Sequence, residues 1–230
     1  MSKLPLVSII VSTFNNSNSI EESIESLLFQ TYENIEILLL DDCSTDDTKS
    51  KVVELSKKNR KIRPFFNKHN LGLTKSLNIL IDNSKGEIIA RHDADDISFQ
   101  TRIEEQVNIL VKRQLDFCTS LAIRNDNDKK IPRFSNKISK KILLKYKNPF
   151  IHGTLIIKKN VLIEIGKYNE SFLYAQDYEL FNKLLNARRK FKVINKPLYL
   201  LNMQDNISTI KKREQAYYAD CVKKGLTPNV

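Results

Sequence analysis

Short apolar runs alternate along this chain with segments in which apolar residues recur every three or four positions. The first run covers Leu4–Ser12, and Ile20, Ile24, Leu27 and Leu28 follow it at helical spacing. An unbroken apolar run of this length is typical of a strand that is buried on both faces, as in a parallel sheet. The pattern therefore predicts a strand, a loop and a helix as the opening unit.

The same unit recurs through the first half of the chain. Further strands are expected at Ile35–Leu40, at Ile62–Phe66 and in the apolar run from Glu87, with helices from Val52, from Leu77 and over about Phe99–Arg113. Alternating strands and helices imply right-handed crossovers and a parallel sheet. The expected fold class is α/β, with a Rossmann-like, doubly wound, mostly parallel sheet and helices on both faces.

The second half of the chain is less regular. Its expected elements are strands at Leu115–Ile123, Asn148–Lys158, Phe191–Ile194 and Leu198–Leu201, helices from Asn160 and after Asp177, and a polar helix over Lys211–Lys223. A chain of 230 residues is long enough for one sizeable core. We therefore expect a single domain over residues 1–230, with a C-terminal region that is less regular than the beginning.

Composition and charge limit the classes of protein that fit. Hydrophobic residues make up 41% and charged residues 28% of the chain, which is typical of a globular protein. No segment resembles a signal peptide or a membrane span, so we expect a cytoplasmic protein. Cys43, Cys118 and Cys221 have no metal-type spacing and are expected to be reduced thiols. The net charge of +11 favours an anionic partner: nucleic acid, acidic lipid or a phosphorylated substrate.

Three carboxylates stand within four positions at Asp93, Asp95 and Asp96, directly after an expected buried strand. Like charges this close raise one another's pKa, so a cation, solvent or a partner must offset the repulsion. Oxygen ligands suit Mg²⁺ or Mn²⁺, and Mg²⁺ commonly takes one or two carboxylates together with substrate phosphate. The alternative is a solvated loop in which Asp96 or Ser98 caps the next helix.

Two other expected strands also end in polar loops. Ligands of an open parallel sheet bind beyond the carboxyl ends of its strands, where such loops converge. Asp42 could accept a hydrogen bond from a nucleobase, Phe14 could pack on the ring, and Lys75 could approach a base carbonyl or phosphate. For Asp41 and Asp42 the alternative is ordinary turn and helix-cap chemistry. The chain has no glycine-rich phosphate loop, so a metal and side chains must meet the phosphate charge.

Taken together, these loops resemble one known family, the inverting nucleotide-sugar glycosyltransferases of family 2, which have the GT-A fold. The segments that carry the resemblance occur in the family's order and are Val7–Asn15, Leu40–Thr48, Asn70–Asn78, Ala90–Asp96 and Gln176–Leu180. The resemblance implies a nucleotide-sugar-binding half at about 1–114, an acceptor-side half at about 115–205 and a C-terminal polar helix at about 206–230. It also implies Mn²⁺ or Mg²⁺ as cofactor.

The resemblance further implies a role for each matching position. The nucleotide-binding positions are Ser12, Thr13, Phe14, Asn15, Asp42, Lys75 and Asp95. Asp42 matches the carboxylate that reads uracil, which favours a UDP-sugar. Asp96 matches the last carboxylate of the metal motif, with Asp95 beside it, and Asp93 matches the first. Asp177 matches the general base, for which the alternative from the residues alone is a helix N-cap.

Five positions carry weaker expectations. Cys43 stands where glycine is common in the family, and Gln176 stands where Glu often precedes the base, which leaves the orientation of the acceptor hydroxyl open. Gln176, Arg91 and Asp93 are candidate donor or acceptor contacts. Arg91 could pair with the neighbouring carboxylates or with phosphate. His152 is also a candidate contact, and a satisfied, partly buried histidine is the alternative.

The implied reaction transfers a hexosyl or N-acetylhexosaminyl group, with inversion, to a hydroxyl of a glycan or lipid-linked acceptor in lipooligosaccharide or capsule synthesis. The basic segment Lys129–Lys147 carries both lysines and apolar residues, so it could rest on the anionic inner face of the plasma membrane. An ordinary solvated helix face is the alternative.

Three other functions remain open at this point. Clustered aspartates and positive charge also suit a metal-dependent phosphotransferase or nuclease. A nucleic-acid-binding module is not expected, because no reading motif and no aromatic residues are interleaved with the basic run. A non-catalytic nucleotide-sugar-binding protein is disfavoured by the presence of both Asp96 and Asp177.

Overall fold

The computed structural model describes residues 4–132, 139–204 and 211–229. The strands are β1 (Val7–Thr13), β2 (Ile35–Asp41), β3 (Ile62–Phe66), β4 (Ile88–Arg91), β5 (Ile97–Ser98), β6 (Phe117–Arg124), β7 (Lys130–Ile131), β8 (Ile156–Lys158) and β9 (Phe191–Leu201). The helices are α1 (Ile20–Leu28), α2 (Thr48–Lys58), α3 (Leu73–Asn83), α4 (Arg102–Lys112), α5 (Lys140–Leu144), the 3₁₀ turn η1 (His152–Thr154), α6 (Lys159–Glu164), α7 (Gln176–Asn186) and α9 (Lys212–Lys224).

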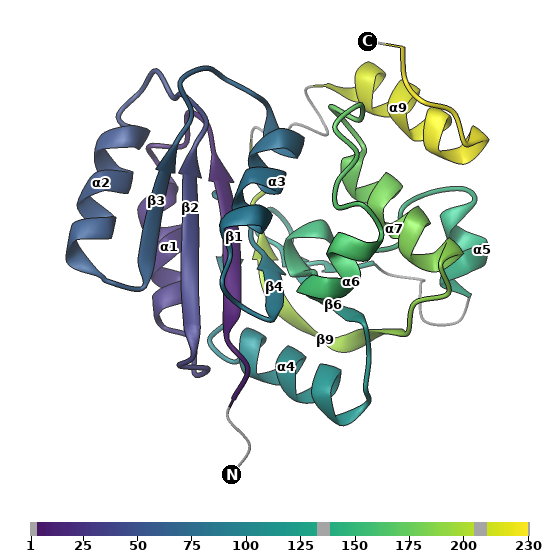
Figure 1. Cartoon of the computed structure of the whole chain (residues 1–230), viewed down its shortest axis with the longest axis horizontal. Helices are drawn as coiled ribbons and strands as arrows, with labels where there is room; N and C mark the ends of the chain where they lie inside the picture. The colour runs from purple at the N-terminus through teal and green to yellow at the C-terminus, as the bar shows by residue number, and fades with distance from the viewer. Residues whose placement is uncertain (1–3, 133–138, 205–210, 230) are drawn as a thin grey trace.

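The described strands form one nine-stranded sheet in the order β3-β2-β1-β4-β8-β6-β9-β5, with β7 paired to β6 (Figure 1). The first four strands are parallel to one another, and β1 lies between β2 and β4. The apolar runs of the first half thus form the wound parallel sheet that the sequence predicts. Because these strands are parallel, the loops that follow β1, β2 and β4 gather at one edge of the sheet, where ligands bind in such folds.

The second half adds mostly antiparallel strands to this sheet. β8 pairs antiparallel with both β4 and β6, whereas β6 and β9 are parallel and their register shifts twice. Two expectations for this half are wrong in detail. The run from Asn148 contains a strand only at Ile156–Lys158, because η1 turns the chain first. The two expected late strands are the single irregular strand β9.

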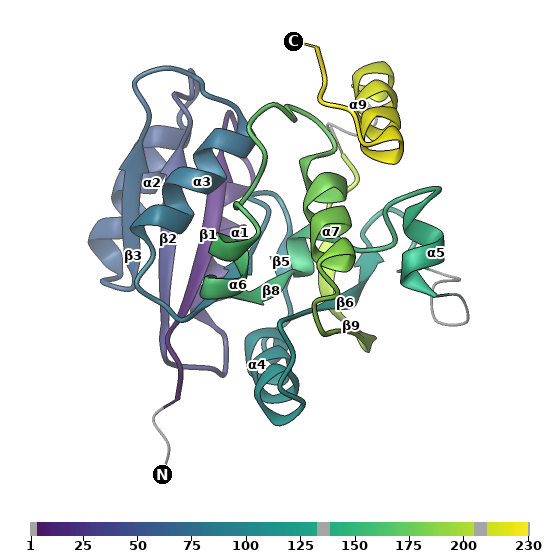
Figure 2. The same cartoon turned by 45° about the vertical axis from the view of Figure 1, so that its right-hand side comes forward.

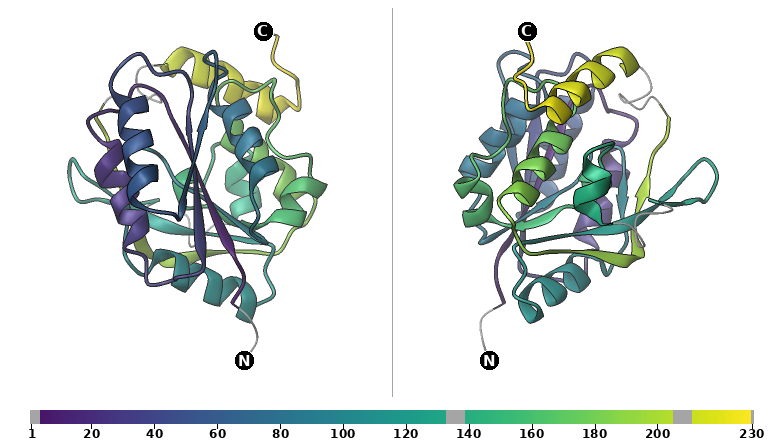
Figure 3. Two further views of the ribbon diagram at one scale, coloured as in Figure 1. Left: turned by 60° about the vertical axis from the view of Figure 1, so that its left-hand side comes forward. Right: turned by 90° about the vertical axis from the view of Figure 1, so that its right-hand side faces the viewer.

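Helices cover both faces of the sheet and enclose two hydrophobic cores. One core joins α3, α6 and α7 to the face that carries Ile10 and Ile89, and α9 completes it. The other joins α1, α2 and α4 to the face that carries Ile9 and Ile88. The left view of Figure 3 shows α1 and α2 on one side of the sheet and α3 on the other. Side chains that alternate along β4 therefore point into different environments.

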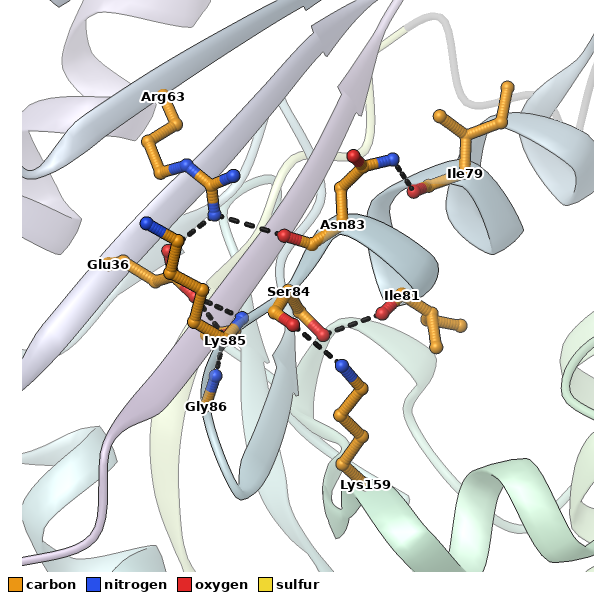
Figure 4. Close-up of polar contacts among 10 residues, drawn as sticks. Glu36, Arg63, Ile79, Ile81, Asn83, Ser84, Lys85, Gly86 and Lys159 are labelled. Carbon is orange, nitrogen blue, oxygen red and sulfur yellow. Dashed lines mark hydrogen bonds and ion pairs between the residues drawn. The ribbon is translucent and has the colours of Figure 1, made fainter.

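A satisfied polar network closes the edge of the sheet opposite the β1, β2 and β4 loops. Glu36 of β2 accepts hydrogen bonds at 2.6 Å from the Ser8 hydroxyl, from the Lys85 backbone N–H and from the Arg63 guanidinium (Figure 4). The Gly86 N–H donates to Ser8 at 2.8 Å. Burial raises the pKa of Glu36, but these hydrogen bonds and the Arg63 charge outweigh burial and leave the pKa lowered. We call these five residues the Glu36 network.

The basic segment lies mostly at the surface, although Leu144 of α5 is 6% exposed and belongs to the core that α7 joins. Residues 133–138 of this segment lie outside the described part of the chain. Of the described residues, Ile142 and Tyr146 are 54% and 71% exposed. Both α5 and α9 pack against α7 (Figure 2). Within the described ranges, no helix has the length and apolar character that crossing a bilayer requires.

Candidate active site

The acidic loop, residues 93–96, lies between β4 and β5 at the carboxyl end of the sheet. Asp93 and Asp95 are partly exposed, whereas Asp96 is 3% exposed. An oxygen of the Asp96 carboxylate accepts a hydrogen bond from the Asn202 N–H at 2.7 Å. Asp96 is therefore anchored to the end of β9, and the two more accessible carboxylates of the loop belong to Asp93 and Asp95.

Two helix-capping alternatives are wrong. Thr101 occupies the N-cap position of α4, so neither Asp96 nor Ser98 caps that helix. At α7 the N-cap position belongs to Ala175, which has the left-handed φ of 52°, and Asp177 lies inside the first turn. Capping therefore does not explain why carboxylates occupy these positions.

The acidic loop is electrostatically strained as it stands. Burial raises the pKa of Asp95 to about 6, and the charge of Asp93 adds to that effect. Burial also raises the pKa of Asp96 to about 9, with Asp93 and Asp95 pushing in the same direction. A cation bound beside these groups would relieve the repulsion and favour their charged forms.

Arg91 supports this loop from below. The guanidinium is 2% exposed and pairs with the Asp93 carboxylate, which confirms the predicted pairing with a neighbouring carboxylate. Among the described residues, Nε and Nη1 of Arg91 have no hydrogen-bond partner. A buried cation thus adjoins the first carboxylate of the loop, so Asp93 is partly neutralised from within the protein.

A histidine–tyrosine pair lies near both the acidic loop and α7. Nε2 of His152 lies 2.7 Å from the Tyr168 hydroxyl. Burial lowers the pKa of His152 and Arg91 lowers it further, while Asp177 and Asp93 oppose the shift. The pKa of Tyr168 is raised by burial, and the same two aspartates raise it as well. Asp93 and Asp177 therefore lie within electrostatic reach of one His–Tyr pair, although 84 positions separate them in the sequence.

The Asp177 carboxylate has a fixed orientation. One of its oxygens accepts a hydrogen bond from the Asn148 side-chain nitrogen at 2.6 Å. The Asn148 side-chain oxygen in turn accepts the Phe150 N–H at 3.0 Å, which sets the direction of the amide. Gln176 is buried beside Asp177 at the first position of α7. A half-buried carboxylate that is held by one oxygen can use the other toward an acceptor hydroxyl.

Asp42 holds the loop that leads into α3. The carboxylate is 2% exposed and accepts hydrogen bonds from the Asn67 side chain at 2.7 Å, from the Leu71 N–H at 2.9 Å and from the Gly72 N–H at 2.8 Å. Asp41 accepts weaker bonds from the Ser44 N–H, as the turn alternative predicts. The role of Asp42 toward uracil stays a prediction, and its bonds show that it also organises the loop.

The remaining predicted nucleotide contacts lie around the same edge. Asn15 joins the β1 and β2 loops, since its side-chain oxygen accepts the Thr45 N–H at 2.9 Å. Phe14 is 44% exposed and Lys75 is exposed near the start of α3. Ser12 is partly exposed, whereas Thr13 is buried and its hydroxyl has no hydrogen-bond partner among the described residues. In the described part of the chain, no backbone hydrogen bond joins Ser12, Thr13 or Lys75 to the acidic loop.

The start of α3 also reaches the segment that precedes α7. The Thr74 hydroxyl donates to the Phe172 carbonyl at 2.7 Å. Because Gly72, two residues earlier, bonds to Asp42, this contact connects the Asp42 loop with the approach to Asp177. The structure thus brings both ends of the predicted site toward one side of the sheet.

Three residues of the site are absent from the predictions made from the sequence. Tyr199 and Asn148 hold Asp93 and Asp177, but neither lies in a recognisable pattern. Gly153 could be anticipated, because an isolated glycine in a strand-like run indicates a close approach of other groups. A Cβ at Gly153 would lie 2.5 Å from the Tyr199 hydroxyl oxygen and 2.7 Å from a carboxylate oxygen of Asp93.

The side chains of the acidic loop fit a hard divalent cation. Asp93 and Asp95 offer accessible carboxylate oxygens, the donor type that Mg²⁺ and Mn²⁺ prefer. Arg91 compensates the charge of Asp93, and the pKa of Asp95 is raised. No group of three or more His, Cys, Asp or Glu side chains in the described ranges could enclose a metal ion by itself. The site therefore suits a cation whose shell is completed by phosphate and water. The anchoring of Asp96 favours Asp95 over Asp96 as a ligand.

The fold and this edge define an α/β protein with clustered carboxylates at the carboxyl end of its parallel strands, and comparison with known proteins gives the family. The family model described as glycosyl transferase family 2 matches residues 8–169. The chain belongs to this family. The fold accordingly is GT-A, as expected from the resemblance of its loops.

Relatives with known sequences agree with this membership. An uncharacterised glycosyltransferase of Haemophilus influenzae is 35% identical over 202 residues, which cover 80% of this chain and 61% of the relative. The O-antigen biosynthesis glycosyltransferase WbnJ of Escherichia coli is 28% identical over 237 residues, covering 97% of this chain and 88% of WbnJ. The chain thus spans about three fifths of the Haemophilus relative.

Solved structures share the fold. TarS of S. aureus (1-349) in complex with UDP aligns with a TM-score of 0.76 and 21% identity, covering 95% of this chain and 64% of TarS. The mannosyltransferase PcManGT of Pyrobaculum calidifontis, in complex with GDP-Man and Mn²⁺, aligns with a TM-score of 0.75 and 20% identity, covering 99% of this chain and 67% of PcManGT. At these identities the likeness concerns the fold alone.

Proposed function

We propose that this chain transfers a sugar from a nucleoside diphosphate sugar to a hydroxyl of a saccharide or lipid-linked saccharide acceptor, with inversion at the transferred carbon. One observation carries the proposal. One short segment adjoins both groups: Asn148 donates a hydrogen bond to the Asp177 carboxylate, and a Cβ at Gly153 would lie 2.7 Å from an Asp93 carboxylate oxygen, so the proposed cation ligand and the proposed base flank one place. Family membership supplies the reaction class.

The donor is proposed to bind across the loops that follow β1 and β2. Phe14 offers an exposed ring for the nucleobase and Lys75 an exposed cation for a base carbonyl or phosphate. UDP is the proposed nucleotide because of Asp42, and the bound UDP of TarS is consistent with it. PcManGT binds GDP-Man, so a guanine nucleotide is the competing donor.

Asp95 and Asp93 would hold Mn²⁺ or Mg²⁺ together with the diphosphate. When bound, the cation stabilises the negative charge that grows on the diphosphate as the bond to the sugar breaks. Arg91, from beneath, keeps the Asp93 carboxylate in place through its ion pair. The acidic loop therefore orients the leaving group, and the buried arginine prevents Asp93 from turning away.

Asp177 is the proposed base. As the acceptor oxygen bonds to the sugar carbon, the carbon–oxygen bond to the diphosphate breaks, and the hydroxyl proton passes to Asp177. Attack from the face opposite the diphosphate inverts the configuration. Asn148 holds one oxygen of Asp177, which leaves the other for this proton. Gln176, the first residue of α7, is an amide and not an acid, so no carboxylate directly precedes Asp177.

A panel of UDP- and GDP-sugars tests the function. With Mn²⁺, the protein is expected to release the nucleoside diphosphate from one donor faster than from the others, and EDTA should stop the release. Transfer of the sugar to added saccharide acceptors would be followed by mass spectrometry. Phosphate release or cleavage of nucleic acid without any sugar transfer would instead indicate a phosphotransferase or nuclease. Binding of a donor without turnover would indicate a non-catalytic protein.

We also propose, from its basic and apolar surface, that the protein meets its acceptor at an anionic membrane surface in surface-polysaccharide synthesis. Lys141, Ile142, Lys145, Tyr146 and Lys147 are exposed in and after α5. Basic residues beside apolar ones are typical of segments that rest on anionic lipid. Co-sedimentation with vesicles should require acidic lipid and weaken with salt, and binding that ignores both would reject this partner.

A further inference from the structure

Tyr199 brings the far end of the chain into contact with the acidic loop. The side chain comes from β9 and is 0% exposed. The Asp93 backbone N–H donates a hydrogen bond to the Tyr199 hydroxyl at 2.9 Å. The phenol thus contacts the first aspartate of the loop directly.

The ring of Tyr199 is itself locked in place. The Arg102 guanidinium lies 5.0 Å from the ring centroid, and the His92 ring packs edge-on at 5.4 Å. Arg102 is fixed because it donates to the Ser98 hydroxyl at 2.7 Å and to the Arg91 carbonyl at 2.6 Å. The hydroxyl therefore occupies a position that the surrounding side chains determine before any ligand binds.

A second contact from β9 holds the same loop. The Asn202 N–H bonds to Asp96, and Leu200 pairs with Ile97 immediately after the loop. Between the two anchored aspartates, Asp95 stays partly exposed. The loop is thus held at both ends, and the carboxylates of Asp93 and Asp95 remain partly exposed.

We propose that the Tyr199 hydroxyl is a positioning group that sets the acidic loop in the geometry that binds a divalent cation together with a nucleoside diphosphate. The inference rests on the proposed function and deepens it. Tyr199 acts through Asp93 and is not itself a ligand of the cation. Residues that orient metal ligands from outside the first layer commonly change metal affinity when they are removed.

Tyr199→Phe tests this role because it removes the hydroxyl and keeps the ring that packs against Arg102 and His92. Tyr32→Phe is the matched control, since the buried Tyr32 hydroxyl donates to the Pro5 carbonyl at 2.6 Å, outside the site. Free Mn²⁺ is measured by electron paramagnetic resonance during titration of each protein with Mn²⁺ in the presence of UDP. Donor KM and kcat are measured at saturating Mn²⁺.

Tyr199→Phe is expected to weaken Mn²⁺ binding by about 10-fold or more, the range found for outer-layer partners of metal ligands. UDP binding in EDTA should stay within about twofold of wild type, as should every property of Tyr32→Phe. Donor KM should rise more than kcat falls. Mn²⁺ affinity equal to wild type in Tyr199→Phe would overturn the inference while leaving the proposed function intact.

Gly153→Ala provides an independent variant if Tyr199→Phe does not fold. Its Cβ would lie 2.5 Å from the Tyr199 hydroxyl oxygen and 2.7 Å from an Asp93 carboxylate oxygen, so these groups must shift although the Tyr199 hydroxyl is kept. Mn²⁺ binding should weaken as well. Unchanged Mn²⁺ affinity in this variant would also count against Tyr199. Wild type that binds Mn²⁺ with UDP but transfers no sugar would refute the proposed function and leave the role of Tyr199 standing.

Discussion

Glu36 and Asp95 are both carboxylates beside parallel strands of one sheet, yet their surroundings are opposite. Glu36, near the start of β2, receives three hydrogen bonds, and its pKa is lowered. Asp95, beyond the end of β4, is crowded by Asp93, and its pKa is raised to about 6. Both groups are partly removed from water, so burial alone does not separate them.

The difference lies in whether the protein itself satisfies the charge. At the edge of Glu36 the chain supplies a guanidinium, a hydroxyl and a backbone N–H, so no ligand is needed. At the other edge Arg91 pairs with Asp93, whereas Asp95 forms no ion pair among the described residues and its pKa is raised. Unsatisfied charge at the carboxyl end of a parallel sheet is thus the mark of a site, and satisfied charge is the mark of a structural network.

The largest effect is expected from Asp177→Asn. Loss of a general base commonly lowers the rate by about 10²- to 10⁴-fold, so transfer should fall by that factor while donor binding stays unchanged. Rates of sugar transfer and calorimetric titration with the donor would measure the two. Asp82→Asn is the control, because Asp82 is an exposed carboxylate paired with Lys167. Full turnover by Asp177→Asn would remove the base assignment.

Glu36→Ala should lower stability and leave ligand binding unchanged. Its free-energy effect should be smaller than that of Asp177→Asn on the transfer rate. Removing Glu36 leaves three donors without their charged acceptor, and a hydrogen bond to a charged group contributes roughly 1.5–3 kcal/mol. Because the Arg63 side chain is 31% exposed, water can replace part of what is lost, so the free energy of unfolding should fall by about one such bond, roughly 2–3 kcal/mol. Urea unfolding would measure it. Mn²⁺ and UDP binding by the folded protein should not change.

Glu164→Ala is the control for Glu36→Ala, because Glu164 forms an exposed pair with Arg189. Exposed ion pairs contribute about 0–1 kcal/mol, so this variant should unfold almost like wild type. A stability loss as large as that of Glu36→Ala would show that the Glu36 network is not special. Loss of cation binding in Glu36→Ala would show that the two edges are not independent.

The smallest effect is expected in the pH dependence of stability. Because the pKa of Glu36 is lower in the folded state, its stabilising contribution is present above the unfolded value of about 4.3 and is lost as pH falls through the folded value. The stability difference between wild type and Glu36→Gln should therefore shrink between pH 7 and about pH 3. A difference that stays constant would contradict the assigned cause.

The sequence predicts the wound half of this fold well because its signals are local. The apolar run at the start of the chain contains β1 (Val7–Thr13). The helical spacing of Ile20, Ile24 and Leu27 corresponds to α1, in which all three side chains are buried. β9 is less predictable, since its register against β6 shifts at Ser120 and Leu121. Register depends on neighbouring strands that the local pattern does not identify.

The candidate site is predictable in its carboxylates and not in their partners. Asp93, Asp95 and Asp177 stand out because acidic residues next to buried elements are costly. Apart from Arg91, which pairs with the Asp93 carboxylate, the groups that hold these residues are uncharged: the Tyr199 hydroxyl accepts the Asp93 backbone N–H, and the Asn148 amide donates to the Asp177 carboxylate. Such groups are common everywhere in a sequence, so only the fold identifies them.

The anchoring of Asp96 is the clearest example of information that the fold adds. In sequence, Asp96 matches the last carboxylate of the metal motif, and the adjacent Asp95 is a candidate for the ribose or the metal. In the structure, the backbone N–H of Asn202, just after β9, donates to the Asp96 carboxylate, whereas Asp95 is partly exposed. The separate fates of these neighbours depend on Asn202, a residue 106 positions from Asp96.

Anomalous diffraction at the manganese edge, from crystals grown with Mn²⁺ and UDP, tests the central claim most directly. The account predicts a single strong peak within coordination distance of the Asp95 carboxylate, with Asp93 beside it and diphosphate oxygens completing the shell. It predicts no peak at Glu36. A manganese peak remote from Asp95, or UDP bound away from the loops that follow β1 and β2, would contradict the account.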